Sequence, residues 1–243
     1  MQSLIDICVQ YSKRWKFKFS PAKSQVMKFT KHTMLINLHL DNNIIPECKT
    51  LKHVGIILEN GFNPTERTIT ACRLIRSLSM SIIKQGIHSS VMNPIVCSKI
   101  ILQLCYTKAL YGCELWNNLT NNEIVLLERA HRYVCKYVQG LPKLTRTDKC
   151  TTLLGWTSIE CYIDSKKLLF LGRLYNMPSR FLPKQIFITR LLLYLNNCIT
   201  ISGGFIPDII KIVRKYDLFS YVDNFVKTSS FPSSKKVEIS NQK

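Results

Sequence analysis

The hydrophobic pattern changes near residue 62 and divides the chain into a strand-like part and a helical part. Before that point, the pattern predicts one helix over residues 3–15, followed by short alternating runs. After it, apolar side chains recur every three or four residues, as they do on the buried face of an α-helix. The pattern therefore predicts an α+β chain that is mainly α, with a small antiparallel strand region followed by a helical bundle.

The first strand-like stretch reads WKFKFSPAKSQVMKF, residues 15–29. Aromatic and basic side chains alternate at its start: Trp15, Lys16, Phe17, Lys18 and Phe19. This period of two predicts a strand, with a turn at Ser20 and Pro21 and a second strand over Gln25–Phe29. The three aromatic side chains would all lie on one side, so we expect them in the core and not against nucleic-acid bases.

Two further segments carry strand signals. LHLDNNIIPE has an Asp-Asn-Asn turn between two apolar runs, which predicts a hairpin. LKHVGIILEN predicts another strand, with Gly55 in its middle. A glycine inside a strand marks a bulge or a close approach of another backbone.

The helical part contains local start and stop signals. Asn93-Pro94, Thr120–Glu123 and Thr157–Glu160 are typical helix beginnings, the last two as capping boxes, and Gly86 and Gly140 are typical ends. The predicted helices cover residues 66–85, 94–115, 121–139, 158–176 and 183–195, with one or two more over 207–225. We expect the 94–115 helix to be buried, because it is apolar nearly all round. The expected domains are 1–62, 63–200 and 201–243, the last with short helices and a frayed polar tail.

Composition adds a strong positive charge to this picture. The chain of 243 residues has 34 Lys and Arg against 15 Asp and Glu, a formal net charge of +19. Between Asp6 and Asp41 there is no acidic residue at all. Such an imbalance indicates a polyanionic partner, and a nucleic acid fits better than a membrane, because no basic amphipathic anchor is visible.

The cysteines and histidines do not indicate a metal site. The ten cysteines are scattered, form no Cys-x-x-Cys pair, and complete no zinc spacing with the five histidines. The N-terminal residues lack the plan of a signal peptide, and no transmembrane span is apparent. We therefore expect free thiols and an intracellular protein of the nucleus or cytoplasm, not a secreted one.

Several of these segments, in this order, resemble the reverse transcriptase of non-LTR (LINE-type) retrotransposons. ICVQYSKRWKFKFSPAKSQVMKF and LKHVGIILE are similar to the end of its palm, where His53–Ile56 matches the primer-grip strand. NPIVCSKIILQLCYTKALYGCELW, LERAHRYVCKYVQGLP and LLGWTSIECYIDSKKLLFLGRL are similar to its helical thumb and the region after it. The resemblance covers about residues 4–195 and implies a palm end followed by a thumb-like bundle.

The departures from this family concern catalysis. The palm motifs with the catalytic aspartates are not in this chain, nor are the endonuclease domain and the zinc knuckle found in many relatives, and Ser20 stands where the family has asparagine. The full-length family uses Mg²⁺, but we expect this chain to hold no cofactor and not to polymerise by itself. Lys23 matches a palm lysine proposed to protonate pyrophosphate, so it would be a vestigial catalytic residue or a plain surface lysine.

The resemblance also implies a partner and its contacts. The partner would be an RNA–DNA or DNA duplex, held mainly by its phosphates. The expected contacts are Lys16, Lys18, Lys28, Gly55, Arg73, Arg76, Arg129, Arg132 and Lys136. For the arginines, a solvated helix face is the alternative interpretation, and both remain open here.

Three hypotheses about function follow from these observations. The chain is a polymerase fragment that binds nucleic acid without catalysing, a co-opted helical nucleic-acid-binding or interaction module, or a truncated product with no function.

Overall fold

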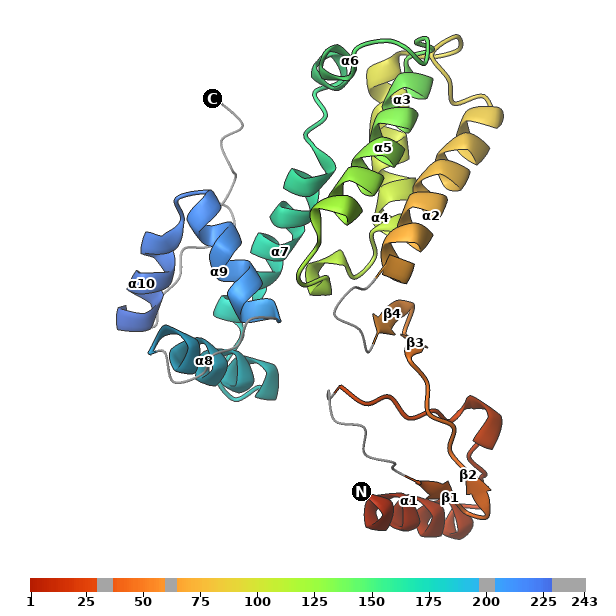
Figure 1. Ribbon diagram of the computed structural model, residues 1–243, viewed down its shortest axis with the longest axis vertical. Helices are drawn as coiled ribbons and strands as arrows, with labels where there is room; N and C mark the ends of the chain where they lie inside the picture. The colour runs from red at the N-terminus through yellow and green to blue at the C-terminus, as the bar shows by residue number, and fades with distance from the viewer. Residues whose placement is uncertain (30–36, 60–64, 197–203, 229–243) are drawn as a thin grey trace. The chain divides into compact units, whose positions relative to one another are not determined.

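The computed structural model describes residues 1–29, 37–59, 65–196 and 204–228 (Figure 1). The described chain is mainly helical and has two small antiparallel two-stranded sheets near its N-terminus, which confirms the predicted fold class. It divides into two compact units, Met1–Arg67 and Thr68–Lys243.

The first unit is built on a single helix. Helix α1 (Gln2–Arg14) packs against strand β1 (His39–Leu40), which pairs with β2 (Asn43–Ile44). The Gln2 side chain donates to the His39 carbonyl at 2.9 Å and accepts from the His39 amide at 2.9 Å. Asp41 in the turn has a φ of 56°. The predicted hairpin is therefore present, and the Gln2 amide fixes it to the helix.

Residues 15–29 do not form the predicted strand pair. Helix α1 ends with Lys16 in the left-handed region at φ 58°, and the Phe17 amide donates back to the Ser12 carbonyl at 3.1 Å. The turn at Pro21–Lys23 is a short 3₁₀ helix, and Val26 makes only an isolated parallel bridge to Glu47. Alternation over five residues was not enough, because a strand also needs a neighbour to accept its hydrogen bonds.

The aromatic side chains of this stretch are not in the core. Trp15 is 62% exposed, and Phe17 and Phe19 are each 42% exposed. The expectation that they are buried was therefore wrong. The buried apolar residues described in this unit are Leu38 and Leu40, which come from the strand β1 region instead.

The segment predicted as one strand with Gly55 in its middle is a hairpin. Strands β3 (Thr50–His53) and β4 (Ile56–Glu59) pair antiparallel, with His53 opposite Ile56. Val54 and Gly55 form the two-residue turn, with φ values of 49° and 84°. Positive φ at both positions is the type I′ turn, whose twist matches that of paired strands. Gly55 therefore lies at a turn and not inside a strand.

The second unit begins with a helical core. Its elements are α2 (Thr65–Lys84), α3 (Pro94–Ile101), the π turn η2 (Leu102–Tyr106), α4 (Thr107–Ala109), the 3₁₀ turn η3 (Cys113–Leu115), α5 (Asn121–Val138), α6 (Thr147–Leu154) and the first half of α7 (Ile159–Asn176). The predicted 94–115 helix is thus interrupted, and α6 was not predicted. The core is formed by side chains such as Ile75, Ile101, Leu127 and Val134, all fully buried.

The helix beginnings follow the sequence signals closely. The Asn93 side chain accepts from the Ile95 amide at 2.8 Å, and Thr120 and Glu123 form both halves of a capping box. Helix α7 begins one residue later than predicted, because Ser158, and not Thr157, accepts a hydrogen bond from the Cys161 amide. Gly86 and Gly140 end their helices with positive φ, as predicted.

A second core surrounds the last half of α7. Helices α8 (Leu182–Leu195), α9 (Phe205–Lys215) and α10 (Phe219–Thr228) pack around it (Figure 1). The Lys167 side chain is 3% exposed, and its ammonium pairs with Asp208 of α9 at 2.5 Å. The described part of the segment 201–243 is therefore packed within the second unit; its polar tail lies outside the described residues. None of the described helices is long and apolar enough to cross a lipid bilayer.

Candidate nucleic-acid interface

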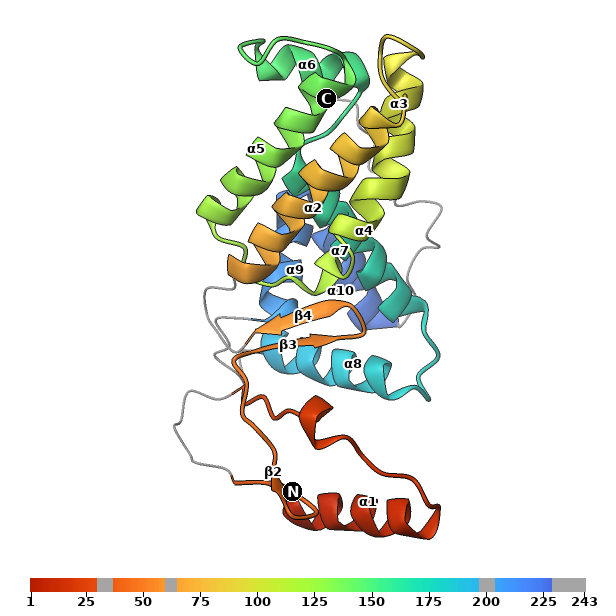
Figure 2. The same ribbon diagram turned by 90° about the vertical axis from the view of Figure 1, so that its right-hand side faces the viewer.

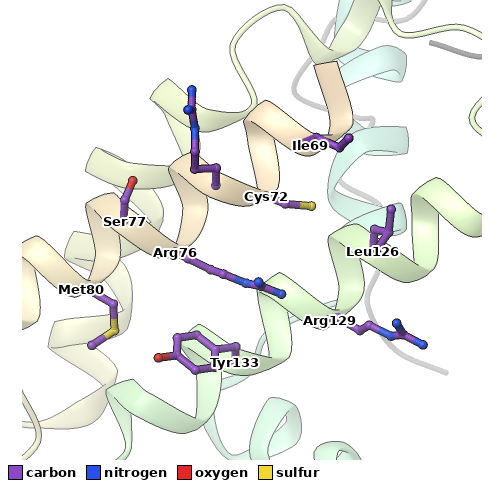
Figure 3. A pocket seen from close by; sticks show the side chains of 9 residues that line it. Ile69, Cys72, Arg76, Ser77, Met80, Leu126, Arg129 and Tyr133 are labelled. Carbon is purple, nitrogen blue, oxygen red and sulfur yellow. The ribbon is translucent and has the colours of Figure 1, made fainter. Parts of the chain in front are cut away.

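Helices α2 and α5 lie side by side in the second unit (Figure 2). Their facing side chains line an open groove (Figure 3). The Thr68 hydroxyl of α2 donates to the buried Glu123 carboxylate of α5 at 2.7 Å, which joins the two helices at one end. The cavity between them has a volume of about 810 Å³. It is lined by Ile69, Cys72, Arg73, Arg76, Ser77, Met80, Leu126, Arg129 and Tyr133.

A second hollow of about 300 Å³ continues from the first along α5. Its lining is Arg129, Arg132, Tyr133, Lys136, Tyr137, Leu141, Lys143 and Thr147, so the two hollows share Arg129 and Tyr133. We call the two together the α2–α5 groove. All five cations that were predicted as contacts on the helices of this unit line it: Arg73, Arg76, Arg129, Arg132 and Lys136.

Helical periodicity explains why these side chains share one surface. On α2, the lining residues follow one another at spacings of three or four, such as Ile69, Arg73 and Arg76. On α5, Arg129 and Tyr133 are four residues apart in the same way. The opposite faces of both helices supply buried residues to the first core, so the cationic faces are left outward.

The charged side chains that line the groove are all positive. Its linings contain six cationic side chains, including Lys143, and no carboxylate. Arg132 pairs with Glu128 at 3.4 Å on the same helix. Arg73 and Arg129 form no ion pair with any residue that the structure describes. Unpaired arginines in such a place favour binding of an anion.

Two of the other cations are held in place by local contacts. The Arg76 guanidinium lies over the Tyr133 ring, 5.8 Å from its centroid, and Figure 3 shows it reaching from α2 towards α5. The Lys136 ammonium donates to the Lys143 carbonyl at 2.7 Å, which fixes the loop after α5 against the helix. A cation–π contact leaves the edge N–H groups of a guanidinium available for a further acceptor.

The chemistry of the lining is suited to binding. Partial burial raises the pKa of the Cys72 thiol, so this group is uncharged near neutral pH and is a poor nucleophile. Neither lining contains a histidine, aspartate or glutamate that could act as a general base. The lining of the larger hollow is mostly apolar, and its apolar side chains include Ile69 and Leu126, which are 52% and 38% exposed.

The remaining predicted residues belong to the first unit. Lys16, Lys18 and Lys23 are exposed, and Lys23 ends the 3₁₀ turn. The side chain of Lys28 is only 10% exposed, and its ammonium pairs with Glu47 at 2.6 Å. Gly55 lies in the β3–β4 turn, so the expectation that it lies inside a strand was wrong.

Tyr133 and Lys143 are among the groove residues that the sequence did not predict. Tyr133 lies four residues after Arg129, so the helical period could have placed it on the same face. Lys143 follows the end of α5 at Gly140, and only the fold of that loop brings it to the groove.

The described residues contain no group of three or more His, Cys, Asp or Glu side chains arranged to hold a metal ion. The nine described cysteines are free thiols. Comparison with protein-family models, curated proteins and solved structures found no match to this chain.

Proposed function

We propose that this chain binds a nucleic-acid duplex through its phosphates along the α2–α5 groove. The observation that supports this most is the meeting of Arg73, Arg76, Arg129, Arg132 and Lys136 on one groove without a carboxylate among its lining residues. Arginine suits this role because its planar donors match phosphate geometry and its charge is permanent. Phosphate contacts of this kind position a duplex without reading its sequence.

The resemblance to LINE-type reverse transcriptases narrows the proposed partner to an RNA–DNA or DNA duplex, handled by a thumb-like bundle. In this proposal the chain holds no cofactor, works in the nucleus or cytoplasm, and does not polymerise by itself, which a primer-extension assay with Mg²⁺ would test. Lys23 is then an exposed lysine that once served catalysis.

One observation favours a second candidate function. The lining of the groove is largely apolar, whereas a phosphate backbone needs only charge and hydrogen-bond donors. An acidic amphipathic helix would contact both the apolar side chains of the lining and the arginines. The alternative is therefore a co-opted interaction module that binds an acidic protein segment. A truncated product without function would bind neither partner specifically.

Salt dependence and a pair of substitutions test the first proposal. Fluorescence anisotropy would follow binding of a labelled DNA duplex and an RNA–DNA duplex at about 50 mM and about 200 mM salt. Affinity is expected to fall steeply with salt. The double variant Arg73→Glu, Arg129→Glu should lower affinity about tenfold or more and reduce the log–log salt slope by about 2, since each phosphate contact contributes about 0.9.

A matched control separates the groove from total charge. Arg190→Glu with Lys211→Glu makes the same change in net charge at exposed positions of α8 and α9, outside the groove. This control should bind nearly as well as the wild type. Equal losses of duplex affinity in both variants would show that total charge attracts the duplex, and would contradict a site in the groove. Duplex binding that is weak at all salt concentrations, together with binding of an acidic peptide, would support the interaction module instead.

A further inference from the structure

The end of α1 carries a cluster of exposed aromatic rings that is separate from the α2–α5 groove. We call it the aromatic patch, and it consists of Tyr11, Trp15, Phe17 and Phe19. Their exposed fractions are 56%, 62%, 42% and 42%. Clustered large apolar side chains at this exposure commonly mark a binding surface.

The rings form one continuous group. The centroid of Tyr11 is 6.0 Å from that of Trp15 and 6.1 Å from that of Phe17, and Phe17 is 5.3 Å from Phe19. The left-handed backbone at Lys16 makes this possible, because it turns the chain so that Phe17 returns to the helix it has just left. A hydrophobic contact of this kind commonly accompanies such a helix end, but it does not account for the exposure of Trp15 and Phe19.

Cationic side chains are interleaved with the rings. Residues 11–19 contain Lys13, Arg14, Lys16 and Lys18, all exposed, and no acidic residue. Only Lys13 among them pairs with a described carboxylate, that of Asp41 at 3.2 Å. The patch therefore combines exposed ring faces with positive charge that is mostly not neutralised.

We propose that the aromatic patch binds single-stranded nucleic acid, with unpaired bases stacked on the rings and phosphates held by Arg14, Lys16 and Lys18. Every base has a π face, so aromatic platforms bind single strands with little sequence preference, and basic side chains beside them hold the backbone. The bases of a duplex are already stacked on one another, so they cannot stack on the aromatic rings. The patch is therefore a second site, with a ligand different from that of the groove.

Charge argues against the other occupants. A second copy of this chain would bring the same cations against themselves, which opposes self-association. An apolar segment of another protein would cover the rings but leave the lysines without partners. Such a segment would also accept leucine in place of phenylalanine, whereas base stacking requires a ring.

Binding of an oligothymidylate of about 12 nucleotides to the full chain tests the proposal. Trp116 and Trp156 are 5% and 8% exposed, so Trp15 is the tryptophan whose fluorescence stacked bases would quench. We expect quenching in the wild type and a loss of affinity of about tenfold or more in Phe17→Leu, Phe19→Leu, measured by anisotropy of labelled oligothymidylate. Phe181→Leu, which removes a 44% exposed ring elsewhere, should bind like the wild type.

Variants of the two sites should lose binding of different ligands. Arg73→Glu, Arg129→Glu should keep most oligothymidylate binding and lose duplex binding, and the leucine variant should do the reverse, with circular dichroism confirming that its helices remain. Unchanged oligothymidylate affinity in the leucine variant would overturn the proposal and leave the groove untouched.

Discussion

The imidazole of His131 is buried at the centre of the first helical core. Its Nε2 lies 3.0 Å from the Thr157 carbonyl, which can only accept, so Nε2 carries the proton. Its Nδ1 therefore accepts from the Tyr106 hydroxyl at 2.8 Å, and the ring stacks on Trp156 at 4.8 Å. These contacts make His131 a packing residue of the core.

This arrangement makes the stability of the second unit depend on pH. Burial lowers the pKa of His131 from 6.5 to about 4. The unfolded chain therefore binds a proton that the folded chain excludes between these values, and stability falls as the pH drops through this window. Between pH 7 and pH 5 the free energy of unfolding should decrease by about 2 kcal/mol through this group.

Urea denaturation at both pH values measures this effect. A His131→Gln variant should be less stable throughout but should lose much of the pH dependence, because its side chain does not titrate. His88, a partly exposed histidine of the same unit, offers the matched His88→Gln control, which should keep the wild-type slope. If the histidine-to-glutamine change at position 131 leaves the pH dependence intact, carboxylates and not His131 are its cause.

Among the elements, the β3–β4 hairpin contains the most evident local strain. Val54 occupies a turn position with φ 49°, which a β-branched side chain adopts at a cost of about 1–2 kcal/mol. Asparagine followed by glycine is the preferred pair for this turn. Val54 is also 72% exposed, so no packing is lost on changing it.

We therefore expect Val54→Asn to stabilise the hairpin by about 1 kcal/mol. Amide hydrogen exchange of the paired residues, such as Leu51 and Ile57, would show slower exchange. Gly55→Ala is the opposite case, since φ 84° disfavours any side chain, and it should speed exchange. Faster exchange in the asparagine variant would mean that Val54 makes a contact that stabilises the turn.

The helices and the strands differ in how far the sequence predicted them. The capping box at Thr120 and the cap at Asn93 were predicted because both bonds lie within three residues along the chain. The strand expected over residues 15–19 did not form, because its partner had to come from elsewhere in the chain. On α5, the helical period places Arg129, Arg132 and Lys136 on one side. A period within one helix does not show that arginines of α2 line the same groove.

For the molecule as a whole, the division at Arg67 and Thr68 has an energetic consequence. The first unit buries few described apolar side chains, among them Leu38 and Leu40, whereas the second contains two extensive cores. Small units with little buried apolar surface are only marginally stable. The first unit should therefore unfold at a lower denaturant concentration than the second.

Tryptophan fluorescence can resolve the two transitions. Trp15 belongs to the first unit, whereas Trp116 and Trp156 are buried in the second. In guanidinium, the emission of wild-type protein should change in two steps, and Trp15→Phe should retain only the step at higher denaturant. Coincident single transitions in both proteins, matched by circular dichroism, would show that the units unfold together.

By itself, the sequence determined the types of most helices, their caps and the excess of positive charge, because helical hydrogen bonds and charge counts depend on residues close together in the chain. Only the tertiary structure decided that Val54 and Gly55 form a turn, that α2 and α5 share a cationic groove, and that the aromatic side chains after α1 face solvent. Strand pairing and the choice of buried face depend on segments distant in sequence, and a local pattern does not specify which of them meet.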